Sequence, residues 1–186
     1  TDGADVKIYG PTSGTTFGGS MVMGDFNADG RNDLVVAESY YDNYRGRIYI
    51  FYSQNGVVNT NKNITGETAS DSFGAFFASG DFNADGRVDL AVGASVYSTN
   101  AGRAYIFYND GTLPTTAATA DVTIDGEASS RFGYSLASGD FNADGEVDLA
   151  VSAHRYSSDT GRAYIFYNDG SIPTTAGTAD VTITGA

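Results

Sequence analysis

The sequence predicts an all-β protein built from three repeated four-stranded units. The segment GDFNADGRNDL at residues 24–34 recurs almost unchanged at 80–90 and 139–149. The segments around it recur in the same phase. Each of them is short, rich in β-branched or aromatic residues and bounded by Gly, Asn or Asp, which is typical of strands. Helical periodicity is absent. Self-similarity at a fixed period indicates that each repeat is one unit of a stacked array.

We predict four strands per repeat, and in the first repeat they lie near residues 17–25, 33–39, 46–52 and 62–66. The third strand of the second repeat is apolar on both faces, with Ala104 and Ile106 on one face and Tyr105 and Phe107 on the other. We therefore expect this strand to be covered on both sides. The fourth strand alternates apolar and polar residues, which is typical of an outer edge.

Four antiparallel strands that are buried on the inside and polar at the edge describe a β-propeller blade. A blade cannot bury both of its faces alone, so neighbouring blades must stack. We predict a single domain over residues 1–186 with blades at 11–66, 67–126 and 127–186. The segment ADVKIYG at 4–10 copies the fourth strand, so residues 1–10 are expected to form a surplus outer strand. A flat β-solenoid is the alternative architecture.

Each recurring acidic segment has the pattern D-x-N-x-D-G-x-x-D, which indicates a calcium loop. Positions 1, 3, 5 and 9 offer side-chain oxygens, position 7 offers a backbone carbonyl, and Gly at position 6 permits the sharp turn. The candidate ligands are Asp25, Asn27, Asp29, Arg31 and Asp33 in the first loop, Asp81, Asn83, Asp85, Arg87 and Asp89 in the second, and Asp140, Asn142, Asp144, Glu146 and Asp148 in the third. We therefore predict three Ca²⁺ ions per chain.

Calcium suits these loops better than other metals do. Magnesium prefers strict octahedral geometry and retains its waters. Zinc and copper favour His or Cys, and the chain has no Cys and one His. The alternative interpretation is an Asx-rich turn without a metal. Three copies in register favour the metal.

The composition excludes several classes of partner. A formal net charge of −13 argues against nucleic acid and against electrostatic docking on anionic membranes. Hydrophobic residues make up 41% of the chain, which indicates a globular protein. No apolar run approaches the length of a membrane span.

The sequence resembles the FG-GAP repeats of integrin α-subunit propellers and of related proteins. The Phe-Gly pairs begin at Phe17, Phe73 and Phe132, and the calcium loop of the family matches the three acidic segments. The Gly-Ala-Pro element lacks its Pro in all three copies, at 37–39, 93–95 and 152–154. The resemblance implies a calcium-stabilised, extracellular β-propeller involved in adhesion or ligand binding. Propellers of this family usually close with seven blades, whereas this chain has three.

We do not expect an enzyme, because the single His154 has no Ser or Cys motif near it. We expect a structural or adhesion module instead. The alternative is a lectin-like binder of carbohydrate or protein that uses the loops opposite the calcium loops, with candidate residues Tyr40, Tyr41, Tyr44, Tyr97 and Tyr156. These tyrosines could instead fill the interfaces between blades. Asn63 lies in an N-glycosylation sequon.

Assembly is expected because three blades leave two outer faces uncovered. Both ends of the chain look like ordinary repeat, so the sequence predicts no cap at either end. A surplus strand also offers an edge for pairing. The expected partners are flanking blades of a larger chain or further copies of this chain, joined into a ring or a filament.

Overall fold

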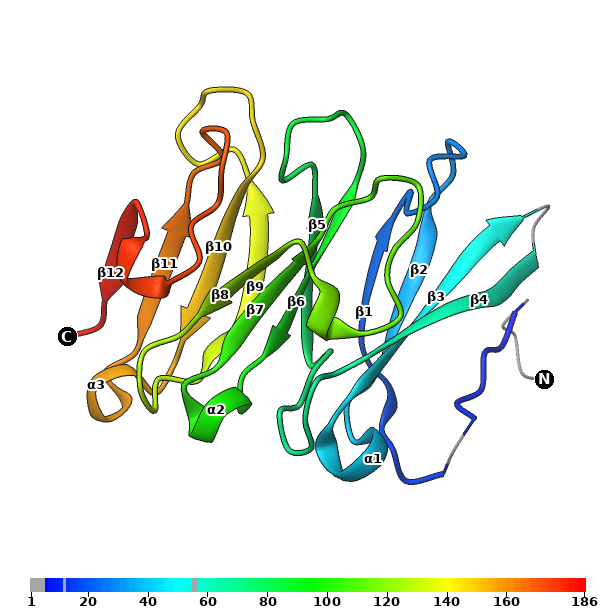
Figure 1. The fold of residues 1–186 in the computed structure, drawn as a ribbon, viewed down its shortest axis with the longest axis horizontal. Helices are drawn as coiled ribbons and strands as arrows, with labels where there is room; N and C mark the ends of the chain where they lie inside the picture. Colours follow the sequence, from blue (N-terminus) through cyan, green and yellow to red (C-terminus); the bar gives the residue numbers. More distant parts are fainter. Residues whose placement is uncertain (1–5, 12, 55–56) are drawn as a thin grey trace.

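The computed structural model describes residues 6–11, 13–54 and 57–186, and these residues form three four-stranded antiparallel sheets. The four strands of each sheet are consecutive in sequence and are adjacent in chain order. In Figure 1 the sheets stand side by side, from the sheet near the N-terminus to the sheet near the C-terminus. This arrangement confirms the predicted all-β fold of propeller blades, which we number 1 to 3 along the chain.

The elements repeat in the same order in each blade. Blade 1 contains β1 (Phe17–Gly24), β2 (Asp33–Glu38), α1 (Tyr41–Tyr44), β3 (Arg47–Gln54) and β4 (Val57–Thr65). Blade 2 contains β5 (Phe76–Gly80), β6 (Asp89–Ala94), α2 (Tyr97–Asn100), β7 (Arg103–Phe107), η1 (Ala117–Thr119) and β8 (Val122–Asp125). Blade 3 contains β9 (Phe132–Gly139), β10 (Asp148–Ala153), α3 (Tyr156–Asp159), β11 (Arg162–Phe166), η2 (Ala176–Thr178) and β12 (Val181–Thr184).

The predicted strands of the first repeat agree with β1, β2 and β3 to within a few residues. β4 begins earlier than predicted, because its pairing with β3 continues out to Gln54 and Val57. Blade 1 therefore ends in a long hairpin. In blades 2 and 3 a longer connection that contains η1 or η2 joins the third and fourth strands.

The helical elements α1, α2 and α3 are four-residue turns, which are too short to leave a periodic signal in the sequence. Three consecutive residues in or just after each turn have φ between 47° and 70°, in the left-handed region. These residues are Asp42, Asn43 and Tyr44, then Ser98, Thr99 and Asn100, and then Ser157, Ser158 and Asp159. In the described part of the chain, no helix has the length and apolar character needed to cross a membrane.

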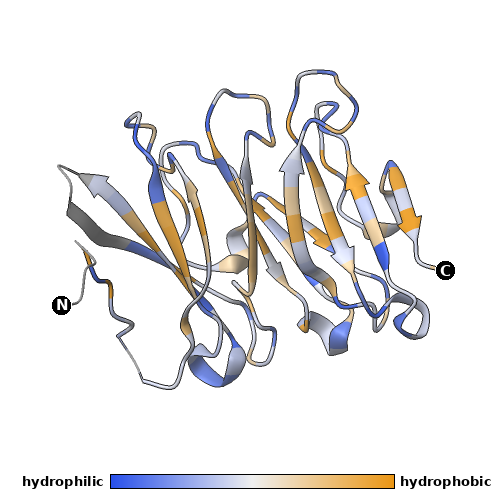
Figure 2. Cartoon of the chain, turned by 180° about the vertical axis from the view of Figure 1, so that it is seen from behind, coloured by the Kyte–Doolittle hydropathy of each residue, from blue (hydrophilic) through white to orange (hydrophobic). Residues whose placement is uncertain are grey.

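The hydrophobic core lies between the blades. Each blade has a leading face toward the blade before it and a trailing face toward the blade after it. The trailing face of blade 1 packs on the leading face of blade 2 in one buried cluster, and blades 2 and 3 share a second cluster. The predicted two-sided burial of β7 is confirmed, since its residues from Ala104 to Phe107 are all 0% exposed. Figure 2 shows hydrophobic residues along the strands and hydrophilic residues in the loops at their ends.

The expected surplus strand at the N-terminus is a wrong prediction for residues 6–10, which form no strand. Residues 1–5 lie outside the described part of the chain. Gly10 packs against Phe17 in the same way that Gly66 packs against Phe73. Among the described residues, no strand outside blade 1 pairs with residues 6–10 to form a ladder. Ile8 instead packs against the leading face of blade 1, where Val36, Tyr49 and Phe51 are buried.

Candidate metal-binding loops

The three acidic segments form equivalent loops that join the first and second strands of each blade. Figure 1 shows these loops at one end of the blades, while α1, α2 and α3 lie at the opposite end. The loops are short enough that their flanking strands remain paired up to the loop, with Gly24 opposite Asp33, Gly80 opposite Asp89 and Gly139 opposite Asp148. The sheets therefore hold both ends of every loop in place.

Backbone amides organise the first loop around its carboxylates. The backbone N–H groups of Asp29 and Gly30 donate to the two carboxylate oxygens of Asp25 at 3.0 and 2.8 Å. The N–H of Asp29 also donates to Asn27 Oδ1, and the N–H of Arg31 donates to Asp29 Oδ1, both at 3.0 Å. Gly30 has φ +83°, which explains the Gly at position 6.

The last Asp of the loop ties it to the body of the blade. Asp33 is 1% exposed and accepts hydrogen bonds from the N–H of Phe26 at 3.0 Å and from the N–H of Ser53 at 2.9 Å. Burial raises the pKa of Asp33, and the two backbone donors oppose that rise. In blade 2 burial raises the pKa of Asp89 to about 6 against the same pair of donors, and Asp85 and Asp81 raise it further.

The same hydrogen bonds recur in the other two loops. In blade 2 the acceptors are Asp81, Asn83, Asp85 and Asp89, and in blade 3 they are Asp140, Asn142, Asp144 and Asp148. Asp89 and Asp148 are both fully buried. A backbone donor from Glu146 lowers the pKa of Asp144. The three loops are therefore built on one plan.

The predicted ligands thus share a loop, but their carboxylates face backbone amides. Among the residues that the structure describes, no three Asp, Glu, His or Cys side chains are grouped closely enough to hold a metal ion. The donor chemistry still fits calcium. Each loop offers three Asp carboxylates, one Asn amide oxygen and the backbone carbonyl of Arg31, Arg87 or Glu146, which are all oxygen donors.

Each of the first two loops is also tied to the following blade, which the sequence analysis missed. The side chain of Asn109 donates to the backbone carbonyl of Asp25 at 3.1 Å, and Asn168 donates to the carbonyl of Asp81 at 3.2 Å. Both asparagines are buried. The signal was present as the Asn in the recurring segment GRAYIFYND, but the partner lies more than 80 residues away in the chain.

The candidate tyrosines at the opposite end fall into two groups. Tyr41, Tyr97 and Tyr156 each lie beneath an arginine guanidinium, that of Arg47, Arg103 or Arg162, at 3.4, 3.9 and 3.6 Å from the ring centroid. Tyr40 and Tyr44 are exposed by 47% and 51%, and their ring centroids lie 4.6 Å apart. The structure thus brings only Tyr40 and Tyr44 together at the surface.

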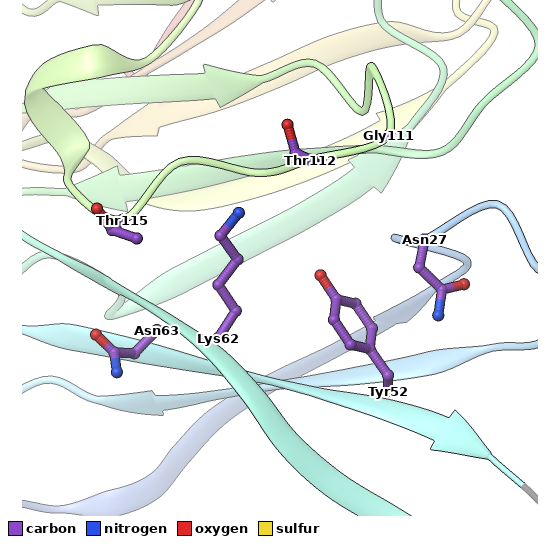
Figure 3. A pocket seen from close by; sticks show the side chains of 7 residues that line it. All are labelled: Asn27, Tyr52, Lys62, Asn63, Gly111, Thr112 and Thr115. Carbon is purple, nitrogen blue, oxygen red and sulfur yellow. The ribbon is translucent and has the colours of Figure 1, made fainter.

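A pocket of about 500 Å³ lies between the hairpin of blade 1 and the β7–β8 connection of blade 2. Figure 3 shows Tyr52 and Lys62 extending from β3 and β4 toward this connection. The lining residues are Asn27, Tyr52, Lys62, Asn63, Gly111, Thr112 and Thr115. The sequence does not predict this pocket, because its residues come from separate segments of two blades.

Stacked four-stranded sheets with one recurring loop define a β-propeller repeat protein. The FG-GAP repeat family matches residues 132–166, and the FG-GAP-like repeat family matches residues 25–92. The chain is therefore an FG-GAP repeat protein, which confirms the resemblance seen in the sequence.

The relatives include integrin α subunits and a phospholipase. The chain is 34% identical to integrin alpha-PS2 of Drosophila melanogaster over 83% of this chain and 12% of that protein. It is 29% identical to integrin alpha-4 of Xenopus laevis over 82% of this chain and 15% of that protein. It is 39% identical to phosphatidylinositol-glycan-specific phospholipase D of Bos taurus over 75% of this chain and 19% of that protein. The chain spans less than a fifth of each relative.

Proposed function

We propose that this chain is a calcium-stabilised, extracellular structural or adhesion module that works by associating with further blades. The observation that carries the proposal is the common hydrogen-bond plan of three acidic loops at one end of the blades. The similarity to integrin α subunits supports an extracellular adhesion role.

Calcium would relieve the repulsion between carboxylates that the loops hold close together. Asp29, Asp85 and Asp144 are exposed, so each of these carboxylates can rotate toward a cation. The buried Asp at position 9 would close the ligand set from the side of the blade, and the carbonyl at position 7 would complete it. In this role the bound cation joins the two strands that flank the loop.

Isothermal titration of calcium into the chelated chain tests this role, and we expect a stoichiometry near three. The variant Asp85→Ala removes one ligand from the second loop and should lower the stoichiometry to two. Asp110→Ala is the matched control, because Asp110 is an exposed Asp of the same blade outside the loop. A stoichiometry near zero for the unaltered chain would rule out the calcium part of the proposal.

We further propose that the chain is not an enzyme. His154 packs its ring against Tyr134 at 3.9 Å between centroids. Burial and the nearby Arg131 and Arg155 lower its pKa. This environment suits a packed neutral imidazole. Incubation of the chain with a phosphatidylinositol-glycan substrate tests the proposal, since one relative is a phospholipase of that name. We expect no release of product.

Ligand binding at the turns is the second candidate function, and the exposed pair Tyr40 and Tyr44 favours it. Exposed aromatic rings present flat apolar surfaces that stack on sugars or on protein side chains. A glycan-bead screen should then lose its signal in Tyr40→Ala and Tyr44→Ala. Tyr156→Ala is the comparison, because Tyr156 lies under Arg162. Equal loss in all three variants would indicate damage to the fold.

Asn63 is the proposed glycosylation site. Its side chain is exposed on β4, while the neighbouring Ile64 is buried. A glycan there would point into solvent beside the pocket of Figure 3. Mass spectrometry of the peptide from a eukaryotic secretory host decides the question, and an unmodified peptide contradicts the proposal.

A further inference from the structure

Lys62 occupies a position that is apolar in the other two blades. Lys62 pairs with Ile50 across β3 and β4, and the equivalent positions of blades 2 and 3 hold Val122 and Val181. Paired residues of neighbouring strands lie on the same face of a sheet, so Lys62 lies beside the buried Ile50 on the trailing face of blade 1. Val122 packs against the core between blades 2 and 3. A cation in the place of a core residue is a local departure from the repeat, and such departures indicate functional positions.

The β7–β8 connection of blade 2 forms the far wall of the pocket in Figure 3, and it is fixed near both of its ends. Near its start the side chain of Asn109 donates to the first acidic loop at 3.1 Å. Near its end the carbonyl of Thr115 accepts from the backbone N–H of Thr65 at 3.1 Å. Between these two ties Leu113 is 1% exposed in the core between blades 1 and 2. The pocket is therefore preformed, and its volume of about 500 Å³ is typical of a small-molecule site.

Two polar groups in this pocket have no partner among the residues that the structure describes. Lys62 Nζ and the Tyr52 hydroxyl make no hydrogen bond or ion pair with them, and Figure 3 shows both groups pointing toward the connection. Burial, and then Asp33, raise the pKa of Tyr52, so its hydroxyl stays protonated and can donate. The Asp110 carboxylate on the connection accepts from the backbone N–H of Thr112 at 3.1 Å. The pocket thus presents one uncompensated positive charge and one free hydroxyl.

These groups together suit a sugar that carries a carboxylate. A single ammonium group balances one negative charge, whereas phosphate sites use arginine forks or several backbone N–H groups. The side chains of Asn27, Thr112 and Thr115 can both donate to and accept from neutral hydroxyl groups. The Tyr52 ring adds a flat apolar surface beside them. A hexuronic acid matches this set, because it combines one carboxylate and several hydroxyls with an apolar ring face.

We propose that this pocket binds a hexuronic acid, with its carboxylate on Lys62 and its hydroxyls on the side chains of the β7–β8 connection. The equivalent interface between blades 2 and 3 is not a second site, because it has Val122 in the place of Lys62. The ligand would contact two blades at once. This inference goes beyond the proposed function and rests neither on calcium binding nor on assembly.

An NMR titration of the full chain, produced without glycosylation at Asn63, tests the proposal with D-galacturonate as the probe. We expect saturable shifts of the backbone amides of Lys62 and of residues 111–115, with a dissociation constant on the order of 1 mM. D-galactose keeps the ring and lacks the carboxylate, and acetate supplies the carboxylate alone. Each should bind at least about tenfold more weakly than galacturonate. The absence of saturable shifts at these residues with galacturonate overturns the proposal.

Lys62→Val tests the role of the charge, because Val is the residue that the other two blades carry at this position. We expect galacturonate to bind at least about tenfold more weakly to this variant. Arg155→Gln is the matched control, since it removes one positive charge from the turn end, where the Arg155 side chain is 53% exposed. It should leave the binding unchanged. Unchanged binding in Lys62→Val contradicts the proposal.

Thr112→Val tests the hydroxyl contacts, because it replaces one hydroxyl of the connection by a methyl group. It should weaken the binding of galacturonate and of galactose alike, whereas Lys62→Val should act on galacturonate alone. A variant Thr112→Val that binds both sugars as the unaltered chain does would contradict the placement of the hydroxyls.

Two further titrations separate this pocket from other ways of holding an anion. Inorganic phosphate that binds more tightly than galacturonate would make the pocket a general oxyanion site and overturn the sugar assignment. Carboxylates also bind calcium, so the galacturonate titration is repeated with EGTA. Shifts at Lys62 and residues 111–115 that persist support the proposal. Shifts that are confined to the acidic loops and vanish with EGTA would mean binding through a cation in those loops and would overturn it.

Discussion

The two ends of the blades differ in what the repeat keeps constant. At the loop end the side chains are nearly identical in all three copies, and so are their hydrogen bonds. At the turn end the backbone is the same but most side chains change, as in YDNY, YSTN and YSSD. This difference shows that side-chain carboxylates accept the hydrogen bonds that hold the loop end together. At the turn end, by contrast, backbone groups make the recurring hydrogen bonds.

The residues that follow the fourth strand of each blade fix the backbone at the turn end. Gly66 N donates to Gly46 O at 2.9 Å, Gly126 N donates to Gly102 O at 2.9 Å, and Gly185 N donates to Gly161 O at 3.0 Å. Arg131 N also donates to Asn100 O, which lies in a left-handed turn. Left-handed residues cost free energy that such surrounding bonds must offset. Because these bonds involve only the backbone, most side chains of the turn can vary.

Removing calcium should have the largest effect on stability, because it acts on the carboxylate side chains of all three loops. Each site held at a hundred times its dissociation constant adds about 2.7 kcal/mol. We therefore expect EGTA to lower the melting temperature, by about 2 to 4 °C for each kcal/mol lost. Circular dichroism melts with calcium, magnesium or EGTA measure this. An identical melting temperature in all three conditions would contradict calcium stabilisation.

Replacing a turn-end tyrosine whose ring lies beneath an arginine should have the next largest effect on the free energy of unfolding. Tyr97 packs against the core beneath Arg103, so Tyr97→Ala should cost about 2 kcal/mol in the free energy of unfolding. Tyr44→Ala should change it by less than about 0.5 kcal/mol, because Tyr44 is 51% exposed. Urea unfolding compares the two variants. An equal loss would mean that the exposed turn residues are structural too.

Two glutamates accept hydrogen bonds from tyrosines of the third strands, and removing them should change the free energy of unfolding by different amounts. In blade 1 the buried Glu38 accepts from Tyr49 at 2.8 Å and from Thr15 Oγ1 at 2.6 Å. In blade 3 the linker residue Glu127 accepts from Tyr164 at 2.9 Å, and its side chain is 37% exposed. Glu38→Ala should cost about 1–3 kcal/mol because it leaves the hydroxyl of the buried Tyr49 without its acceptor. Glu127→Ala should cost less, and chemical denaturation that gives the reverse order would be inconsistent with this account.

The sequence predicted the strands and the loops because both signals are local. Alternating and two-sided apolar runs identify strands, and the spacing of the acidic residues identifies the loops. The ties made by Asn109 and Asn168 are not local, since their partners are carbonyls in another repeat. The surplus strand was predicted wrongly for a related reason. Val6 and Ile8 alternate with polar residues as in a strand, but pairing depends on a neighbouring strand, which the alternating pattern cannot supply.

Replacing His154 should have the smallest effect on stability. His154 lies at a turn position where blades 1 and 2 have Ser39 and Ser95. Burial first, and then Arg131 and Arg155, lower its pKa below the ordinary 6.5 in the folded state, while Asp159 opposes this. Above pH 6.5 the imidazole is neutral in both states, so the folded state keeps its full stability. As the pH falls below 6.5 the unfolded state takes up the proton first, and stability declines until the folded-state pKa is reached. His154→Ser should remove this decline. Paired urea titrations between pH 7.5 and 5 measure the difference between the two proteins, and a difference that does not change with pH would show that His154 titrates alike in both states.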